Sequence, residues 1–125
     1  MYRAYGLLQA SSDFSLDEAA ARLRSRFPDF TIQLEGNRIT AMSGDWEIFL
    51  AENAAPEVLA ESVEFAEKIA GADGTEIAAC VRRVEVWSDV ADPMIEHLGD
   101  FQSVIEVLRS FSGVIAVDPK EPSLM

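Results

Sequence analysis

The stretch FTIQLEGNRITAMSGDWEIFL, residues 30–50, decides the fold. At both of its ends apolar residues occupy every second position, which is the pattern of half-buried β-strands. Between the ends lie two turn signals, Gly36-Asn37 and Ser43-Gly44-Asp45, and glycine and asparagine tolerate the positive φ that a tight hairpin needs. The stretch therefore predicts an antiparallel meander of three strands. The strands are residues 30–35, 38–43 and 46–51, and their expected core side chains are Phe30, Ile32, Leu34, Trp46, Ile48 and Leu50.

Helical patterns precede and follow this meander. Residues 16–27 carry apolar side chains at helical spacing, after the capping pair Ser15 and Glu18 and before a proline. Residues 56–70 carry a second apolar stripe, which begins with a proline in the first turn and is followed by Gly71 as the expected left-handed C-cap. Residues 73–80 are expected to add a short helical turn.

The remainder of the chain predicts further strands and a last helix. Residues 2–9 and 82–88 contain the aromatic and branched side chains typical of strands, and residues 114–117 form a short, continuously apolar strand. Asp100 is the expected N-cap of a helix that ends before Gly113. Residues 118–125 predict an extended C-terminal tail.

The order of these elements, β-α-β-β-β-α-β-α-β, predicts an α+β fold in which helices pack on one face of a single sheet. The β-α-β units at the two ends of the chain are expected to cross over right-handed and to bring their strands parallel. The predicted sheet is therefore mixed and mainly antiparallel. We assign residues 1–117 to one α+β domain and residues 118–125 to the tail.

Composition indicates a folded protein. At 125 residues the chain has the size of one domain, and 49% hydrophobic residues argue against disorder despite a net charge of −12. No apolar run is long enough for a membrane span, and no secretory signal is visible at the start. The single cysteine, Cys80, cannot form an internal disulfide, which fits a reducing compartment. We therefore expect a soluble, cytoplasmic protein.

The negative net charge of the chain narrows the classes of molecule that we expect it to bind. Twenty-two acidic residues against ten basic ones disfavour binding to nucleic acid or to an anionic membrane, because both need a lysine- and arginine-rich surface. The charge is also uneven. Residues 45–76 hold nine acidic residues and one lysine, a net of −8. This part of the chain is therefore expected to form an acidic surface.

The only histidine lies in RRVEVWSDVADPMIEHLGD, residues 82–100. One histidine with carboxylates is a poor ligand set for zinc, and the spacing fits no calcium-binding EF-hand loop. A histidine acting as general base needs a nucleophile to serve and a group to orient it, and the sequence nominates neither. We therefore favour an ordinary strand-to-helix junction, and expect no metal, cofactor or catalytic residue here. The alternative is a polar site made of Arg82, Asp89, Asp92, Glu96 and His97.

Other chemical signals are weak. Cys80 has apolar neighbours on both sides, which favours a buried small side chain over a reactive thiolate. The chain contains no phosphate-binding glycine motif, no GxSxG, no HExxH and no CxxC. Trp46 and Trp87 are expected to pack in the core rather than to form a stacking platform.

The helix over residues 56–70 offers the clearest surface feature. Glu57, Glu61 and Glu64 are four and three residues apart, so they share one outer stripe that ends with Lys68. Such a stripe is either a solvated face or a docking surface for a basic partner, since a field of one sign steers association. Arginines of the helix over residues 16–27 are the other expected partners of these acids, within the chain or across a homodimer.

Two functions remain open. The first is a non-enzymatic protein-binding module that masks or carries a basic protein partner through Glu57, Glu61 and Glu64. In size, charge and element mix the chain is similar to bacterial toxin-neutralising immunity proteins and to export chaperones. The alternative is a small enzyme or small-molecule-binding domain that uses carboxylates and arginines in a cleft between sheet and helices. The absence of a nucleophile–base signature favours the first.

Overall fold

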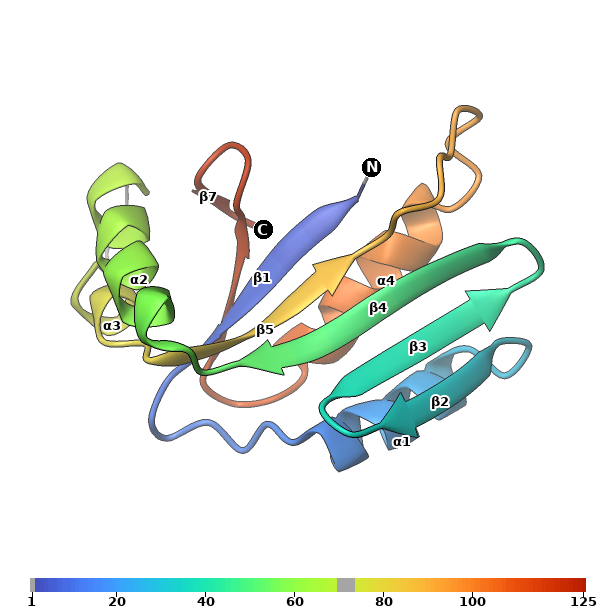
Figure 1. The fold of residues 1–125 in the computed structure, drawn as a ribbon, viewed down its shortest axis with the longest axis horizontal. Coiled ribbons are helices and arrows are strands. Elements are labelled where there is room, and N and C mark those ends of the chain that lie inside the picture. The colour runs from blue at the N-terminus through green and yellow to red at the C-terminus, as the bar shows by residue number, and fades with distance from the viewer. Residues whose placement is uncertain (1, 70–73) are drawn as a thin grey trace.

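The computed structural model describes residues 2–69 and 74–125. Over these residues the chain forms four helices and one sheet of seven strands (Figure 1). The elements in chain order are β1 (Arg3–Leu8), α1 (Leu16–Arg26), β2 (Thr31–Glu35), β3 (Arg38–Ser43), β4 (Trp46–Asn53), α2 (Pro56–Lys68), α3 (Gly74–Ala78), β5 (Arg82–Trp87), α4 (Leu98–Arg109), β6 (Val114–Asp118) and β7 (Ser123–Leu124). No helix in this part of the chain is long and apolar enough to cross a membrane.

The sheet confirms the α+β class and the predicted meander. Its strand order is β2-β3-β4-β5-β1-β6-β7, and β2, β3 and β4 are consecutive antiparallel neighbours as expected, with Ile39 opposite Leu34 on one side and Leu50 on the other. Gly36 and Gly44 adopt φ of +61° and +59° in the two connecting turns, which is the left-handed conformation that the turn signals predicted.

The parallel strand pairs expected within the sheet are not found. All six strand pairings among the described residues are antiparallel. β5 and β6 do run in the same direction, but β1 lies between them and pairs antiparallel with both. β1 and β2 also share a direction and are separated by three other strands. The β-α-β units therefore contribute parallel strands that are not neighbours, which adjacency along the chain could not reveal.

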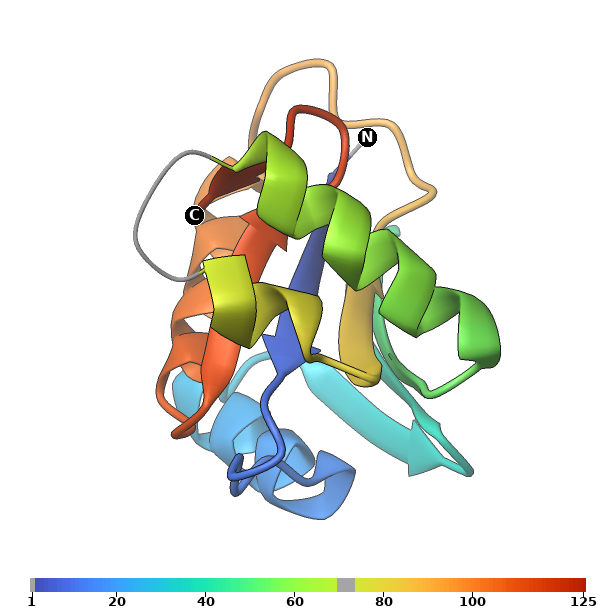
Figure 2. The same ribbon diagram turned by 90° about the vertical axis from the view of Figure 1, so that its left-hand side faces the viewer.

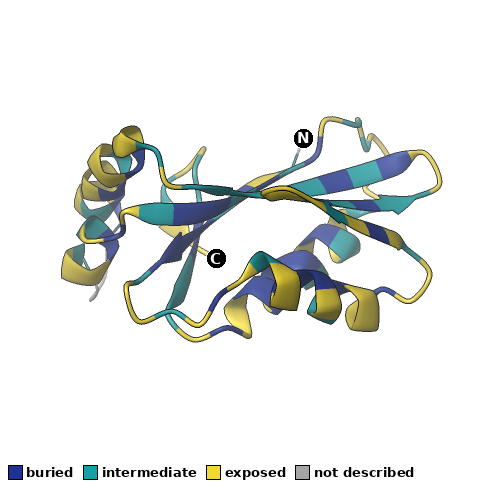
Figure 3. Ribbon diagram, turned by 60° about the horizontal axis from the view of Figure 1, so that its bottom comes forward, coloured by how far each residue is buried: buried dark blue, intermediate teal, exposed yellow. Residues whose placement is uncertain are grey.

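The helices divide between the two faces of the sheet, which corrects the expectation of one covered face. α1 and α4 pack against alternate strand residues, such as Leu8, Val84 and Leu50. Strand residues of the alternate positions form a second cluster with the other two helices. Leu7 and Val117 pack there against Phe65 and Ile69 at α2 and against Ile77 of α3. Because successive strand residues point to opposite faces, these two clusters lie on opposite sides of the sheet. Figures 2 and 3 show α2 and α3 together at one end of the sheet and α1 and α4 beneath its middle.

The main core is the one predicted from the meander. Trp46, Ile48 and Leu50 are buried on the face covered by α1 and α4, together with Ile32. Phe30 and Leu34 are partly buried against the same cluster. The period-2 pattern thus identified the correct face of each strand.

The ends of the helices follow their local sequence in part. The Ser15 hydroxyl accepts a hydrogen bond from the Glu18 amide at 3.2 Å, as the capping pattern predicted, whereas the Glu18 carboxylate bonds Arg22 instead of reaching back to residue 15. α4 begins at Leu98, before the expected cap Asp100, and its N-cap residue His97 makes no side-chain capping bond. Gly71, the expected C-cap of α2, lies outside the described residues.

The C-terminal segment folds back onto the sheet rather than forming a free extended tail. After a turn at residues 119–122, β7 pairs with β6, with Leu124 opposite Val117 and Ser123 opposite Asp118. The Met125 amide also donates to the carbonyl of Ala116 at 3.0 Å. Residues 118–124 are therefore part of the same sheet as the rest of the domain.

The central position of Ile48 predicts a large stability loss on truncation. Ile48 is 0% exposed, so Ile48→Ala should lower the free energy of unfolding by about 2–5 kcal/mol, through lost burial and a residual cavity. The neighbouring change Glu47→Ala, on the opposite face of β4, should cost less than about 0.5 kcal/mol. Urea unfolding measures both, and a larger loss for Glu47→Ala than for Ile48→Ala would mean that the faces of β4 are reversed.

Candidate functional site

Part of the second face of the sheet is left uncovered. In the view of Figure 1, α1 and α4 lie behind the sheet, and α2 and α3 cover only its left-hand end. We call the uncovered surface the open face. It carries the outward residues of β1, β3, β4 and β5, namely Arg3, Tyr5, Arg38, Thr40, Met42, Glu47, Phe49, Glu85 and Trp87.

Three aromatic side chains lie half-buried on the open face. Phe49 and Trp87 are cross-strand neighbours of β4 and β5, with ring centroids 5.3 Å apart. Tyr5 lies on β1 next to Glu85. The expectation that both tryptophans belong to the core is thus correct for Trp46, which is 3% exposed, and wrong for Trp87. The alternation of Val84 and Val86 with Trp87 was the signal that could have placed this ring on the other face.

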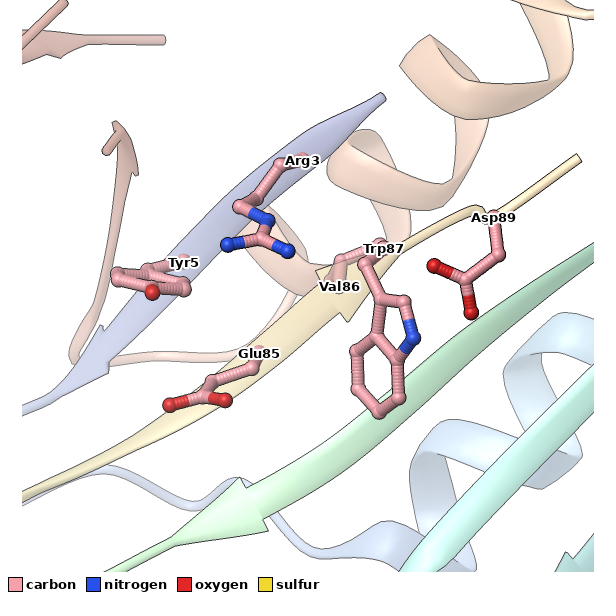
Figure 4. Close-up of a pocket in the computed structure, with 6 residues that line it drawn as sticks. All are labelled: Arg3, Tyr5, Glu85, Val86, Trp87 and Asp89. Atoms are coloured by element: carbon pink, nitrogen blue, oxygen red, sulfur yellow. The ribbon is translucent and has the colours of Figure 1, made fainter. Parts of the chain in front are cut away.

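Trp87 borders a small hollow on the open face (Figure 4). The hollow has a volume of ≈ 190 Å³ and is lined by Arg3, Tyr5, Glu85, Val86, Trp87 and Asp89. Figure 4 shows the Asp89 carboxylate beside the indole of Trp87 and the Arg3 guanidinium above Glu85. Neither Arg3 nor Asp89 makes a side-chain hydrogen bond or ion pair with any residue that the structure describes. The hollow therefore presents an aromatic ring between charges that are free to meet a ligand.

A buried arginine connects the open face to α2. The side chain of Arg83 is 5% exposed, and its guanidinium donates to Glu61 and to Glu85, each at 2.8 Å. It also lies 4.0 Å above the ring centroid of Tyr5. Burial lowers the pKa of Arg83, but the bonds to the two carboxylates outweigh it and raise the pKa above its ordinary value. The charge is thus stable inside the protein because both carboxylates neutralise it.

The stripe predicted on α2 is present, but its members differ. Glu57 and Glu64 are exposed, whereas Glu61 points to the sheet and bonds Arg83. Glu64 and Lys68 also line a hollow of ≈ 200 Å³ between α2 and the turn after β6. The stripe therefore forms an acidic wall beside the open face. We call Glu57, Glu61 and Glu64 the acidic wall.

The alternative polar site does not come together. Arg82 lies at the start of β5 and pairs with Glu52 at 3.5 Å, while Asp89 follows the other end of this strand and lines the hollow beside Trp87. Only Asp92, Glu96 and His97 share a hollow, of ≈ 340 Å³, in the loop before α4.

Asp92 serves to fix the structure of this loop. It accepts hydrogen bonds from the Tyr2 hydroxyl at 2.6 Å and from the backbone amides of Glu96 and His97 at 3.0 and 2.8 Å. Desolvation opposes ionisation, but these bonds prevail and hold the pKa of Asp92 below its ordinary value. The bond to Asp92, aided by desolvation, raises the pKa of Tyr2 to about 12. The Tyr2 hydroxyl and the Asp92 carboxylate therefore stabilise the strand-to-helix junction.

His97 is likewise held by its neighbours. Its Nδ1 lies 3.0 Å from the Asp100 carboxylate, and its ring stacks on Trp46 with centroids 4.4 Å apart. The hollow around it is lined by Asp45, Asp92 and Glu96 but by no serine, threonine, cysteine or lysine, so it offers no hydroxyl, thiol or amine for a histidine base to deprotonate. No metal-binding group of three His, Cys, Asp or Glu side chains occurs within residues 2–69 and 74–125. The geometry supports a structural junction.

Cys80 is buried as predicted. It is 1% exposed, and its thiol donates to the Glu76 carbonyl at 3.4 Å. Burial, with a smaller contribution from the Glu76 charge, raises the pKa of Cys80 to about 11. The thiolate that a nucleophile requires is therefore disfavoured at neutral pH.

Comparison with known proteins provides no further guide to this site, since no family model, curated protein or solved structure matches the chain.

The Arg83 contacts predict that the three glutamates of α2 respond differently to charge reversal. Glu61→Lys removes one carboxylate from a buried guanidinium and adds a repelling charge, so it should lower the free energy of unfolding by about 1–3 kcal/mol. Glu57→Lys and Glu64→Lys should each change it by less than about 0.5 kcal/mol. Urea titration of the three single variants checks this. If Glu61→Lys unfolds at the same midpoint as the other two, Arg83 does not depend on this contact.

The raised pKa of Cys80 predicts a loss of stability at alkaline pH. Between pH 9 and pH 11 the unfolded thiol ionises while the folded thiol stays protonated. The unfolded state then binds fewer protons, so the free energy of unfolding falls as pH rises through this window. Thermal unfolding should show a steeper decline for the wild type than for Cys80→Ala. Tyr2 contributes equally to both proteins, so parallel pH profiles would contradict the assignment to Cys80.

Proposed function

We propose that this chain is a non-enzymatic protein-binding module that masks or carries a basic protein partner, and that the partner binds on the open face and the acidic wall. The observation that carries the proposal is the pair Phe49 and Trp87, half-buried on the part of the sheet that α2 and α3 leave uncovered. Aromatic side chains are enriched in protein interfaces and supply much of their binding energy. Met42 extends this apolar surface onto the neighbouring strand β3.

The charge of the acidic wall and of the whole chain supports a basic partner. Next to the aromatic pair, the acids Glu47 and Asp89 are balanced by Arg3 and Arg38. The negative sign comes from Glu57 and Glu64, which make no side-chain ion pair with any described residue, and from the net charge of −12 over the whole chain. A surface of this sign accelerates encounter with a positively charged protein and disfavours acidic ones. It also disfavours a second copy of this acidic chain as the occupant.

The hollow beside Trp87 is small for a small-molecule site. It has ≈ 190 Å³, below the roughly 300–1,000 Å³ typical of ligand pockets. The hollow at His97, of ≈ 340 Å³, contains no hydroxyl, thiol or amine for the histidine to deprotonate. A cytoplasmic location is part of the same proposal, since the buried thiol of Cys80 fits a reducing compartment.

Site-specific photo-crosslinking tests the proposal. A photoreactive phenylalanine analogue replaces Phe49, and as a matched control it replaces Gln102, which is exposed on α4 on the other side of the sheet. In extracts of the source cell, the probe at position 49 should capture a basic protein that the probe at position 102 does not. Identical capture patterns at both positions would overturn the proposal.

The captured protein, once purified, allows a quantitative test. Phe49→Ala combined with Trp87→Ala should weaken its binding by about 30-fold or more, the effect of losing an interface hot spot, while Gln102→Ala should not. The double variant Glu57→Lys/Glu64→Lys should bind the captured protein more slowly than the wild type at low salt. Added salt should lower the association rate of the wild type until it approaches that of the variant. An association rate unaffected by the charge reversal would mean that the acidic wall plays no part.

A further inference from the structure

We infer that the hollow beside Trp87 is a subsite for one arginine side chain of the partner. This inference rests on the proposed function and specifies the chemistry of the contact. The guanidinium would stack on the free surface of the indole and bond the Asp89 carboxylate at the rim (Figure 4). Stacking on an aromatic ring and bidentate bonding to a carboxylate are the two modes that distinguish arginine from lysine.

Two guanidinium groups of this protein already lie over aromatic rings at the open face. Arg83 lies 4.0 Å above the ring centroid of Tyr5, and Arg38 lies 4.9 Å from that of Phe49. Trp87 is the third aromatic ring of this face, and in the described part of the chain no cation occupies it. Tryptophan offers the strongest cation–π interaction of the aromatic residues. The ring best suited to a guanidinium is thus the one left without an internal partner.

The carboxylates around Trp87 favour a cation. Glu85 and Asp89 stand two residues before and after Trp87 and line the same hollow. Glu85 is fixed by Asn53 at 2.9 Å and by Arg83 at 2.8 Å, both through its Oε2 atom. Asp89 makes no side-chain bond with any described residue, so it is the carboxylate available to an incoming group. The volume of ≈ 190 Å³ suits a single side chain.

Arg3 repels a second cation, so its removal tests whether the hollow binds a cation or an anion. It lies directly across from Trp87 on β1 and lines the same hollow. If the hollow binds arginine, Arg3 weakens binding by repulsion, and its removal should strengthen it. If the hollow binds an anion, Arg3 is the main attraction, and its removal should abolish binding.

The experiment is a titration with N-acetyl-arginine amide, followed by the NMR signals of the Trp87 indole and of the Glu85 and Asp89 amides. Weak, saturable shifts confined to these groups are expected. N-acetyl-citrulline amide, which has nearly the same shape and no charge, is the matched control ligand and should cause none. Equal NMR shifts with the citrulline ligand would overturn the inference, because the site would then not distinguish a charged side chain from a neutral one.

Three variants complete the test. Asp89→Asn should weaken binding of the arginine probe by about twofold to fivefold, the range for an exposed ion pair, and Arg3→Gln should strengthen it by a similar factor. Asp29→Asn, a distant exposed carboxylate, should leave it unchanged. Weaker binding of the probe by Arg3→Gln would overturn the inference, because removing one cation should strengthen the binding of another.

The outcomes separate this inference from the proposed function. A captured partner that requires Phe49 and Trp87, together with no response to the arginine probe, would overturn the subsite and leave the protein-binding function in place. A specific response to the probe, together with identical crosslinks at positions 49 and 102, would support the subsite chemistry and overturn the proposed function.

Discussion

The burial of the second half of β1 on both of its faces is the constraint on which the rest of the structure depends. β1 pairs with β5 on one side and with β6 on the other. Its successive residues Leu7 and Leu8 are 0% and 1% exposed, although they point to opposite faces. A strand with this pattern needs an apolar layer on each side. The helices must therefore divide, with α1 and α4 against Leu8 and α2 and α3 against Leu7.

The open face is a consequence of that division. α2 and α3 are too small to cover the whole second face of the sheet. They pack against the part where β1 and β6 carry apolar residues. Arg83 marks the border of the covered region. Its buried charge requires carboxylates on both sides, and Glu61 of α2 and Glu85 of β5 provide them. This ion-pair group turns the acidic side of α2 toward the sheet and so produces an acidic wall next to exposed aromatic rings.

The two polar regions of the chain therefore have different characters. In the loop before α4 the polar groups bond one another, since Asp92 accepts three hydrogen bonds and His97 is stacked on Trp46. On the open face, Arg3 and Asp89 have no such partners within the described residues. Polar groups that bond one another stabilise a fold, whereas unpaired charges beside an aromatic surface are available to another molecule. For this reason the proposed function is placed at Trp87 rather than at the histidine.

Local sequence determined the elements of this protein. The alternation in residues 30–50, the turn glycines, the cap at Ser15 and the apolar neighbours of Cys80 each act over a few residues, and each predicted its structure correctly. The strand partners of β1, the division of the helices and the exposure of Trp87 depend on contacts between distant segments. An alternating pattern states which residues share a face, but not what covers that face. The stripe Glu57, Glu61 and Glu64 was visible in the sequence, yet only tertiary structure brought Arg83 to Glu61 and placed the stripe beside the open face, because helical spacing orders side chains along one element and cannot say which element lies opposite.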